Sequence, residues 1–335
     1  MGFAAASSHR LPLFLTDADV EKLAHWPTAI AAIRSAYADS MKGQPTPGRI
    51  FAQTADEWIR IMPSIPASGR LFGSKSIAGS FHDGLTVSYL ISLFDKRTAE
   101  LVALVDGNRV TGLRTAATTA VAAALIAPRR ALVVGVIGSG FEARSHLSAL
   151  SHELAFSDIR IFSPTPGNRE ELAADVLASG TSARAVDSAH EAVAGADLVL
   201  CAARSRDESP TVRSEWVAEN AAIISIGSTT PAQRELPIEL IGRAALIVAD
   251  SVEEVMHGSG DMIAARESGL DIASVTVSLA SAVGAGKPLP SEGIRIYKST
   301  GSGLQDVVVA EALYESARSA GVGTLLPVGI VTNRK

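Results

Sequence analysis

Residues 135–143 read GVIGSGFEA and directly follow the apolar run ALVV at 131–134. Gly138, Gly140 and Ala143 occupy the three small positions of the pattern G-x-G-x-x-G/A. In this pattern the first glycine permits a tight turn, the second lets backbone amides approach a pyrophosphate, and the third small residue lets a helix lie close to its strand. The stretch therefore predicts a strand, a phosphate-binding turn and a helix, which together open a dinucleotide-binding fold.

The rest of the second half of the chain alternates between apolar runs and helical patterns. Near-continuous apolar strands that alternate with helices are typical of a parallel sheet covered on both faces. We therefore predict an α/β protein with a doubly wound, Rossmann-type parallel sheet. Its strands are expected at Leu132–Ile137, Ile159–Phe162, Leu198–Ala202, Ala222–Ile226 and Leu246–Ala249.

The first third of the chain has a different pattern of predicted secondary structure. Thr16 and Asp19 have the spacing of a capping box, which predicts a short helix beginning there. Between residues 48 and 94, short β-rich runs separated by turn residues indicate a meandering sheet. Residues 114–127 are rich in alanine and are predicted to form a helix that packs closely against a neighbour.

A long helical pattern closes the chain from about Gln305. We expect this helix to rejoin the first part of the chain. The predicted division is an α+β domain made of residues 1–127 with 305–335, and a nucleotide-binding domain over residues 128–304.

The composition is typical of a globular protein, and the length of the chain favours more than one hydrophobic core. The chain has 335 residues, of which 47% are hydrophobic and 19% charged, and its net charge is −5. No block of Lys and Arg supports binding to nucleic acid or to an anionic membrane. Pro128 and two arginines interrupt the most apolar region, so we expect no membrane span, and the N-terminus has no signal-peptide pattern. The single cysteine, Cys201, lies in an apolar run, which favours a buried thiol, no metal site and a reducing cytoplasm.

The cofactor is predicted from the end of the second strand of the nucleotide-binding domain. An Asp or Glu at this position binds the ribose hydroxyls of NAD. Here the strand ends at Ser163 and Thr165, with no acid at its tip and with Arg169 shortly after. Hydroxyl donors and an arginine suit a 2′-phosphate. We therefore expect NADP(H) to be preferred over NAD(H), which stays the second cofactor.

Taken together, these motifs and others give the chain a family resemblance. It resembles the ornithine cyclodeaminase/mu-crystallin family over nearly its whole length. The resemblance implies an NAD(P)-dependent enzyme that acts on the Cα–N bond of a small amino or imino acid. It also implies a homodimer built through the α+β domain. The matching stretches are PGR at 47–49, IRIMP at 59–63, FGSK at 72–75, LFDKRTAELVALVDGNRVTGLRTAATTA at 93–120, GVIGSGFEA at 135–143, IGSTTPAQREL at 226–236, SGD at 259–261 and YKSTGSGLQDVVVA at 297–310.

The resemblance assigns Arg49, Lys75 and Arg114 to the substrate carboxylate. The residue types agree, because two guanidinium groups and an ammonium suit a planar anion. Lys75 lies among apolar neighbours, where burial lowers the pKa of a lysine, so it is also the expected proton donor or acceptor at nitrogen. The cofactor contacts assigned in this way are Thr115, Gly138, Ser139, Gly140, Phe141, Glu142, Ala143, Gly227 and Ser299.

Two residues depart from the family pattern. The resemblance assigns catalytic roles to Lys75, Arg114 and Thr229. Thr229, however, stands where cyclodeaminases carry an Asp. Because a threonine is not a base at neutral pH, water activation for ammonia loss is disfavoured and hydride transfer to an imine is favoured. Arg60 stands where ornithine-specific members carry an acid, so it is expected to repel a basic substrate side chain. Period-two alternation does not decide which face of its strand lines the site.

The sequence thus predicts an NAD(P)H-dependent imine (ketimine) reductase or amino-acid dehydrogenase. Two alternatives stay open at this point. One is an ammonia-eliminating cyclodeaminase. The other is a non-catalytic NADP-binding protein of the mu-crystallin type, because family membership does not by itself establish turnover.

Overall fold

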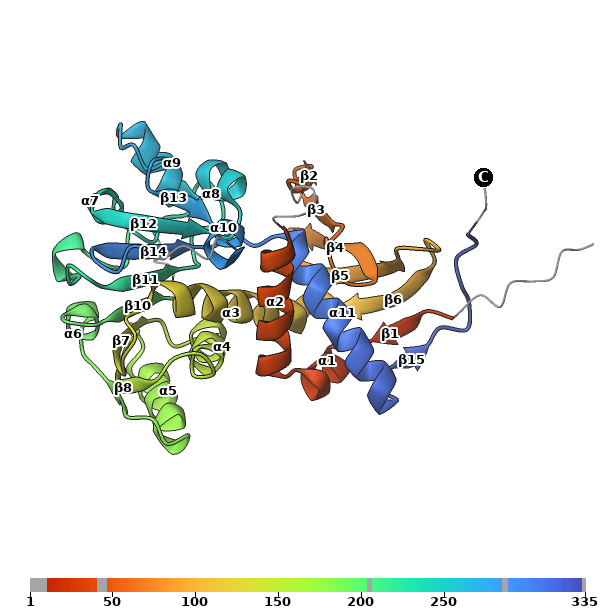
Figure 1. Cartoon of the computed structure of the whole chain (residues 1–335), viewed down its shortest axis with the longest axis horizontal. Helices are drawn as coiled ribbons and strands as arrows, with labels where there is room; N and C mark the ends of the chain where they lie inside the picture. The colour runs from red at the N-terminus through yellow and green to blue at the C-terminus, as the bar shows by residue number, and fades with distance from the viewer. Residues whose placement is uncertain (1–10, 41–46, 204–206, 285–288, 333–335) are drawn as a thin grey trace, which may run out of the picture. The chain divides into compact units, whose positions relative to one another are not determined.

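The computed structural model describes residues 11–40, 47–203, 207–284 and 289–332. These residues fall into two compact units. Unit 1 is drawn from residues 1–114 and 302–335, and unit 2 from residues 115–301. Helix α3 (Gly107–Ile126) runs from one unit into the other and begins at Gly107 rather than at the predicted Arg114 (Figure 1). Among the described residues, no helix has the length and apolarity needed to cross a membrane.

Unit 1 contains the predicted meander. Strands β2 to β6 pair in chain order and antiparallel, and β1 extends the sheet by pairing parallel to β6 and antiparallel to β15. The strands are β1 (Leu13–Leu15), β2 (Ile50–Gln53), β3 (Glu57–Ser64), β4 (Leu71–Ser80), β5 (Thr86–Asp95), β6 (Leu101–Asp106) and β15 (Thr324–Leu325).

Three further helices belong to unit 1: α1 (Asp17–Leu23), α2 (Trp26–Ser40) and α11 (Gly303–Ala320). The capping box of Thr16 and Asp19 is confirmed at the start of α1. Helix α11 packs on β3, β4 and β5, and α2 packs on α11 (Figure 1). Gly303 lets α11 begin close to the sheet, because a Cβ there would lie 2.7 Å from the Pro63 carbonyl oxygen. The sheet and the start of α11 are thereby held in close contact.

Unit 2 is built on an eight-stranded, all-parallel sheet, so the predicted fold class is confirmed. Its order is β13-β12-β14-β11-β10-β7-β8-β9. The strands are β7 (Leu132–Ile137), β8 (Phe156–Phe162), β9 (Ala183–Ala185), β10 (Leu198–Cys201), β11 (Ala222–Ser225), β12 (Ala244–Ala249), β13 (Thr276–Ser278) and β14 (Ile294–Lys298). All five predicted strands are present, and the short strands β9 and β13 and the charged strand β14 are additional.

Helices cover both faces of this sheet, and Figure 1 shows α4 and α6 on opposite sides of β7. The chain leaves β7 for β8 on one side and later returns to β10 on the other. The carboxyl ends of β7 and β10 therefore form the switch point at which open parallel sheets bind ligands. The helical elements of unit 2 are α4 (Phe141–Leu150), α5 (Pro166–Ala178), α6 (Ala189–Val193), α7 (Ile238–Gly242), α8 (Val252–Gly258), α9 (Gly260–Glu267), α10 (Leu279–Gly284) and a short 3-10 turn at Ser214–Trp216.

Candidate functional site

Lys75 lies at the centre of a buried polar cluster in unit 1. It points from the covered face of β4 toward α11 and is fully buried. Its Nζ donates to Asp306 Oδ1 at 2.8 Å and to the Thr111 hydroxyl at 3.3 Å. A charged lysine inside a core requires such a partner, because desolvation of an unpaired ammonium is costly.

Arg114 joins the same cluster from α3. Its Nε lies 3.1 Å from the Asp306 oxygen that Lys75 contacts, and its Nη1 donates to Gln305 Oε1 at 2.7 Å. The Gln305 amide in turn donates to the Tyr37 hydroxyl at 2.8 Å. The structure thus brings Lys75 and Arg114 together around one carboxylate. Gln305 and Asp306 belong to the stretch YKSTGSGLQDVVVA at 297–310, for which the sequence analysis predicts no role of these two residues in the site.

The environment of Lys75 lowers its pKa to about 8. Burial is the main cause, and the positive charges of Arg114 and Arg49 lower the pKa further, while Asp306 opposes them. The expected depressed pKa of Lys75 is present, and it places the proton of this lysine in the range where enzymes exchange protons.

The strand register decides the open question of which way Arg60 faces. Met62 is paired with Lys75, and Arg60 with Ile77, across β3 and β4. Directly paired residues of antiparallel strands share a face, so Arg60 and Lys75 point to the same side of the sheet. Arg60 is therefore on the side of the buried cluster, one pair of residues away from Lys75.

The glycine turn of unit 2 has the geometry that a dinucleotide phosphate needs. Gly138 has a φ of +120°, and a Cβ on it would lie 2.7 Å from the Ala202 carbonyl oxygen at the end of β10. Gly140 is the N-cap of α4, with open space where a Cβ would be and no side-chain cap on the helix. The first amides of α4 are thus available to an anion, while Ala143 is buried. These residues fit the pyrophosphate of NAD(P).

The other residues predicted at this turn have varied surroundings. The Ser139 hydroxyl donates to the Ser163 hydroxyl at 2.8 Å, which ties the turn to the tip of β8. Phe141 is exposed, and the Glu142 carboxylate lies 3.4 Å from His146 Nδ1 on the next turn of α4. Thr115 is half-buried on the part of α3 that belongs to unit 2.

Arg169, in the first turn of α5, reaches the tip of β8 with its side chain but is already engaged by protein groups. Its guanidinium donates to the Ser163 carbonyl at 3.0 Å and to the Asp187 carboxylate at 2.6 Å. The Asp187 side chain is 94% exposed. Thr165 is the N-cap of α5, and its carbonyl accepts from the Ser163 hydroxyl at 3.3 Å. The tip of β8 carries no acid, but Asp187, in the segment after β9, places a carboxylate beside Arg169. The sequence analysis did not predict this residue.

Thr229 lies in a loop that is fixed from within. Gln233 Oε1 accepts from the Thr229 amide at 2.9 Å, from the Thr229 hydroxyl at 3.1 Å and from the Thr230 amide at 3.1 Å. The Gly227 amide, at the start of the loop, donates to Glu235 at 3.0 Å. Thr229 therefore offers a neutral hydroxyl held in one orientation.

A second buried charge cluster anchors this loop to the sheet. Lys298 Nζ, at the end of β14, lies 3.1 Å from Asp261 Oδ2 and 4.0 Å from Glu235. Burial raises the pKa of Glu235 to about 7, against the opposing effect of Lys298. Next along the chain, the Ser299 hydroxyl donates to Asp250 at 2.8 Å. The cluster fixes the positions of Gly227 and Ser299 at neighbouring strand ends.

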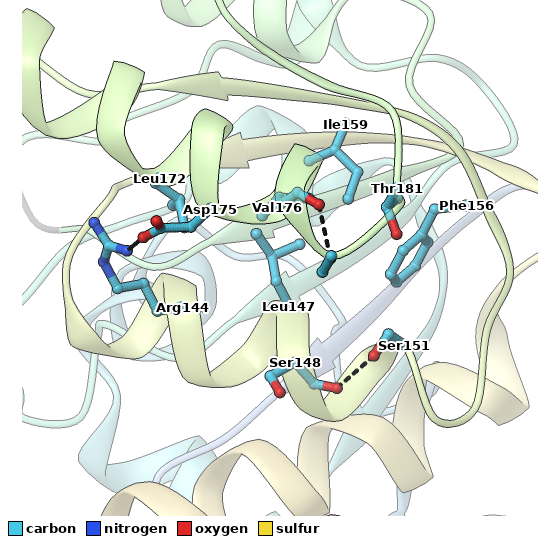
Figure 2. Close-up of a pocket in the computed structure, with 11 residues that line it drawn as sticks. Arg144, Leu147, Ser148, Ser151, Phe156, Ile159, Leu172, Asp175, Val176 and Thr181 are labelled. Carbon is cyan, nitrogen blue, oxygen red and sulfur yellow. Dashed lines mark hydrogen bonds and ion pairs between the residues drawn. The ribbon is translucent and has the colours of Figure 1, made fainter.

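A separate hollow lies between α4 and α5 in unit 2. Figure 2 shows Leu147, Phe156 and Ile159 in its wall, with the ion pair of Arg144 and Asp175 at its side. Phe156 begins β8, so the hollow is at the amino-terminal edge of the sheet. The glycine turn follows the carboxyl end of β7, at the opposite edge of the sheet.

The family model for the ornithine cyclodeaminase/mu-crystallin family matches residues 10–321. The chain belongs to this family. Within it, the ketimine reductase mu-crystallin of Mus musculus is 30% identical over 320 residues, which cover 92% of this chain and 98% of the mouse protein.

Solved structures of family members share the fold. The Δ1-pyrroline-2-carboxylate reductase of Thermococcus litoralis, in complex with NADH and L-proline, has a TM-score of 0.85 at 28% identity. That comparison covers 94% of this chain and all of the other. The iminosuccinate reductase of Paracoccus denitrificans, in complex with NAD+, has a TM-score of 0.86 at 26% identity, with 95% of this chain and all of the other covered.

Proposed function

We propose that this chain is an NAD(P)H-dependent imine reductase whose reverse reaction is that of an amino-acid dehydrogenase. The observation that carries the proposal is the buried cluster of Lys75, Arg114 and Asp306. These three side chains carry a net charge of +1, which one substrate carboxylate cancels. The names of the two structural relatives both describe an imine with a carboxylate on the imine carbon. Such a substrate matches the cluster.

In the proposed reaction, Arg49, Lys75 and Arg114 hold the carboxylate and thereby fix the adjacent C=N group. The glycine turn of unit 2 would hold the reduced dinucleotide, whose chemistry would be the supply of a hydride for the imine carbon. Lys75 supplies the proton to the nitrogen, so that the C=N bond becomes a CH–NH bond. A pKa of about 8 lets Lys75 lose that proton and regain it from solvent near neutral pH.

For the cofactor we propose a preference for NADP(H), with NAD(H) as the weaker ligand. Ser163, Thr165 and Arg169 are the proposed contacts of the 2′-phosphate. To bind the phosphate, Arg169 must give up its ion pair with Asp187. Because the Asp187 carboxylate is exposed, Arg169 can exchange it for the phosphate at small cost. Thr115, Gly227 and Ser299 remain proposed cofactor contacts.

The ammonia-eliminating alternative is not favoured by any described contact of Thr229. Among the described residues, the hydrogen-bond partner of its hydroxyl is the neutral amide of Gln233, which cannot act as the base for water. Because its proton is donated to Gln233, the Thr229 hydroxyl oxygen can accept a hydrogen bond from a protonated substrate nitrogen. We therefore place Thr229 in the reductase as a contact of the substrate nitrogen.

We further propose a homodimer built through unit 1, in the cytoplasm. The sheet face opposite to Lys75 carries Ile50, Ile59 and Leu90, which are exposed by 61%, 41% and 42%. Ile59 and Leu90 are paired with the small residues Ala78 and Ser76 of β4, so these apolar side chains stand out from this face. Such surfaces are typical of protein–protein interfaces.

The proposed reaction is tested by following NAD(P)H oxidation with 2-oxo acids in the presence and absence of an amine, and with cyclic imines. We expect oxidation only when an imine can form. Arg114→Gln should lower kcat/KM by about tenfold to a hundredfold, because a charged hydrogen bond to the substrate is lost. Oxidation of NAD(P)H with the 2-oxo acids in the absence of an amine would contradict the proposal.

A further inference from the structure

The Gln233 side chain fixes the hydroxyl proton of Thr229. Its Oε1 accepts from the backbone amides of Thr229 and Thr230, at 2.9 and 3.1 Å. A backbone amide can only donate, so the atom of Gln233 that faces both amides must be its oxygen. The Thr229 hydroxyl lies 3.1 Å from that same oxygen. Because an amide oxygen carries no hydrogen, the hydroxyl proton must point at Gln233.

The main chain of the loop holds Gln233 in place. The Gln233 amide donates to the Thr230 carbonyl at 3.1 Å, and the Gln233 carbonyl accepts from the Ser228 hydroxyl at 2.6 Å. Gly260, at the start of α9, lies against the same carbonyl, because a Cβ on this glycine would overlap its oxygen. Both main-chain polar groups of Gln233 are thus bound, so its side chain reaches Thr229 from a fixed point.

A hydroxyl whose proton is already donated offers only its lone pairs to a ligand. Within the described parts of the chain, the partner of the Thr229 hydroxyl is Gln233, and Thr229 is half-buried rather than enclosed. The lone pairs suit a group that carries a hydrogen, such as the N–H of a protonated imine or of an ammonium. A carbonyl oxygen can only accept, so it would face another acceptor. The Thr229 oxygen therefore discriminates between nitrogen and oxygen on the substrate carbon.

We propose that Gln233 is a positioning residue, which makes Thr229 an acceptor and thereby selects a protonated imine over the 2-oxo acid of the same carbon skeleton. This inference rests on the proposed function, because it assumes that Thr229 contacts the substrate nitrogen. The two compounds differ only in C=N–H against C=O. Both carry the carboxylate that Lys75 and Arg114 are proposed to hold, so the carboxylate contacts cannot tell them apart. The choice between them is left to the contact at the nitrogen.

The experiment compares L-alanine with pyruvate and L-glutamate with 2-oxoglutarate, by titration calorimetry in the presence of NADP+. Within each pair the carbon skeleton is the same, and N–H donors are exchanged for a carbonyl acceptor. We expect the ratio of the two dissociation constants to favour the amino acid in wild type. In Gln233→Met the Thr229 hydroxyl can turn and donate to the carbonyl, so this preference should fall by about tenfold. Gln233→Glu should keep the preference, because a carboxylate at this position can only accept.

Further variants show whether Gln233 acts through Thr229. The preference should also fall in Thr229→Val, and adding Gln233→Met to that variant should cause no further fall. Ala232→Met places the same methionine at the adjacent, exposed position of the loop and should leave the preference unchanged. A merely structural role of Gln233 would weaken both members of each pair alike, together with NADP+, and would not change the ratio.

A neutron structure of the wild type locates the hydroxyl hydrogen without any substrate. We expect deuterium between Thr229 Oγ1 and Gln233 Oε1, and deuterium on another side of the hydroxyl would overturn the inference, whatever the protein reduces. An equal preference in wild type and Gln233→Met would overturn it as well and leave imine reduction untouched. Absence of binding by every member of both pairs would contradict the proposed function, and the inference that rests on it would fall with it.

Discussion

Lys75 Nζ lies 2.8 Å from Asp306 Oδ1, although the two residues are 231 positions apart in the chain. Both side chains are buried, and Arg114 Nε lies 3.1 Å from the same oxygen. One carboxylate therefore serves two cations. This sharing leaves the three side chains of Lys75, Arg114 and Asp306 one negative charge short of neutrality, which the carboxylate of a substrate would supply.

The first prediction concerns the pH dependence of the reaction. Lys75 must carry its proton to hold the carboxylate and to protonate the nitrogen, so kcat/KM should fall as the pH rises through the pKa of Lys75, about 8. Asp306 raises that pKa. In Asp306→Asn the pKa of Lys75 drops, and the fall of kcat/KM should move to lower pH. The measurement is the pH profile of kcat/KM for both proteins.

Glu315→Gln is the matched control, because Glu315 lies on the same helix and its side chain is 47% exposed. Its profile should coincide with that of the wild type. An alkaline limb that stays in place in Asp306→Asn would show that Lys75 is not the group that titrates.

A second prediction concerns cofactor choice. Wild type should bind NADPH more tightly than NADH, and Arg169→Ala should lower the affinity for NADPH alone, by about tenfold. Asp187→Asn should raise the preference for NADPH, because the competing carboxylate of Arg169 is removed. Dissociation constants at fixed ionic strength test this. If wild type bound NADH tenfold more tightly than NADPH, a difference of about 1.4 kcal/mol, the roles assigned to Ser163, Thr165 and Arg169 would be wrong.

A third prediction separates the two glycines of the turn. Gly138→Ala should destabilise the fold by about 1–3 kcal/mol, since its φ of +120° strains any other residue and the new Cβ meets Ala202. Gly140→Asp should leave the melting temperature unchanged or higher, because the position is open and aspartate is a good N-cap. It should nevertheless abolish NADPH binding, because its carboxylate repels the pyrophosphate. If Gly140→Asp kept the wild-type affinity for NADPH, the pyrophosphate would not bind at this turn.

The fourth prediction is the absence of ornithine cyclodeaminase activity. Thr229 has no group that ionises near neutral pH, so it cannot take a proton from water. Proline formation and ammonia release from L-ornithine should stay at background in wild type, and they should stay low in Thr229→Asp as well, because Arg60 repels the side-chain amine. Robust turnover by the wild type would mean that another residue acts as the base.

The sequence predicted those features that depend on neighbouring residues. The glycine turn is specified by three small residues in a row of nine, and the five buried strands are specified by local apolar runs. Strand β14 was missed because Arg295 and Lys298 interrupt its pattern, although both are buried in the structure. Their burial depends on partners elsewhere in unit 2, which no local pattern records.

Long-range pairings account for the rest of what the sequence reading lacked. The contact of Asp306 with Lys75 joins the last helix to the fourth strand, and the contact of Asp187 with Arg169 joins two neighbouring strand ends. Alternation along β3 gave Arg60 two possible faces, and only the register with β4 selected one. Each of these required the tertiary fold.

The central claim is that hydride is delivered to the carbon of an imine that carries a carboxylate. NADPH deuterated at its transferable position tests this directly, with 2-oxoglutarate and ammonium as substrates and with Δ1-pyrroline-2-carboxylate in parallel. We expect glutamate and proline with one deuterium at Cα, as read by mass spectrometry and NMR. A deuterated 2-hydroxy acid, or an amino acid without deuterium at Cα, would contradict it.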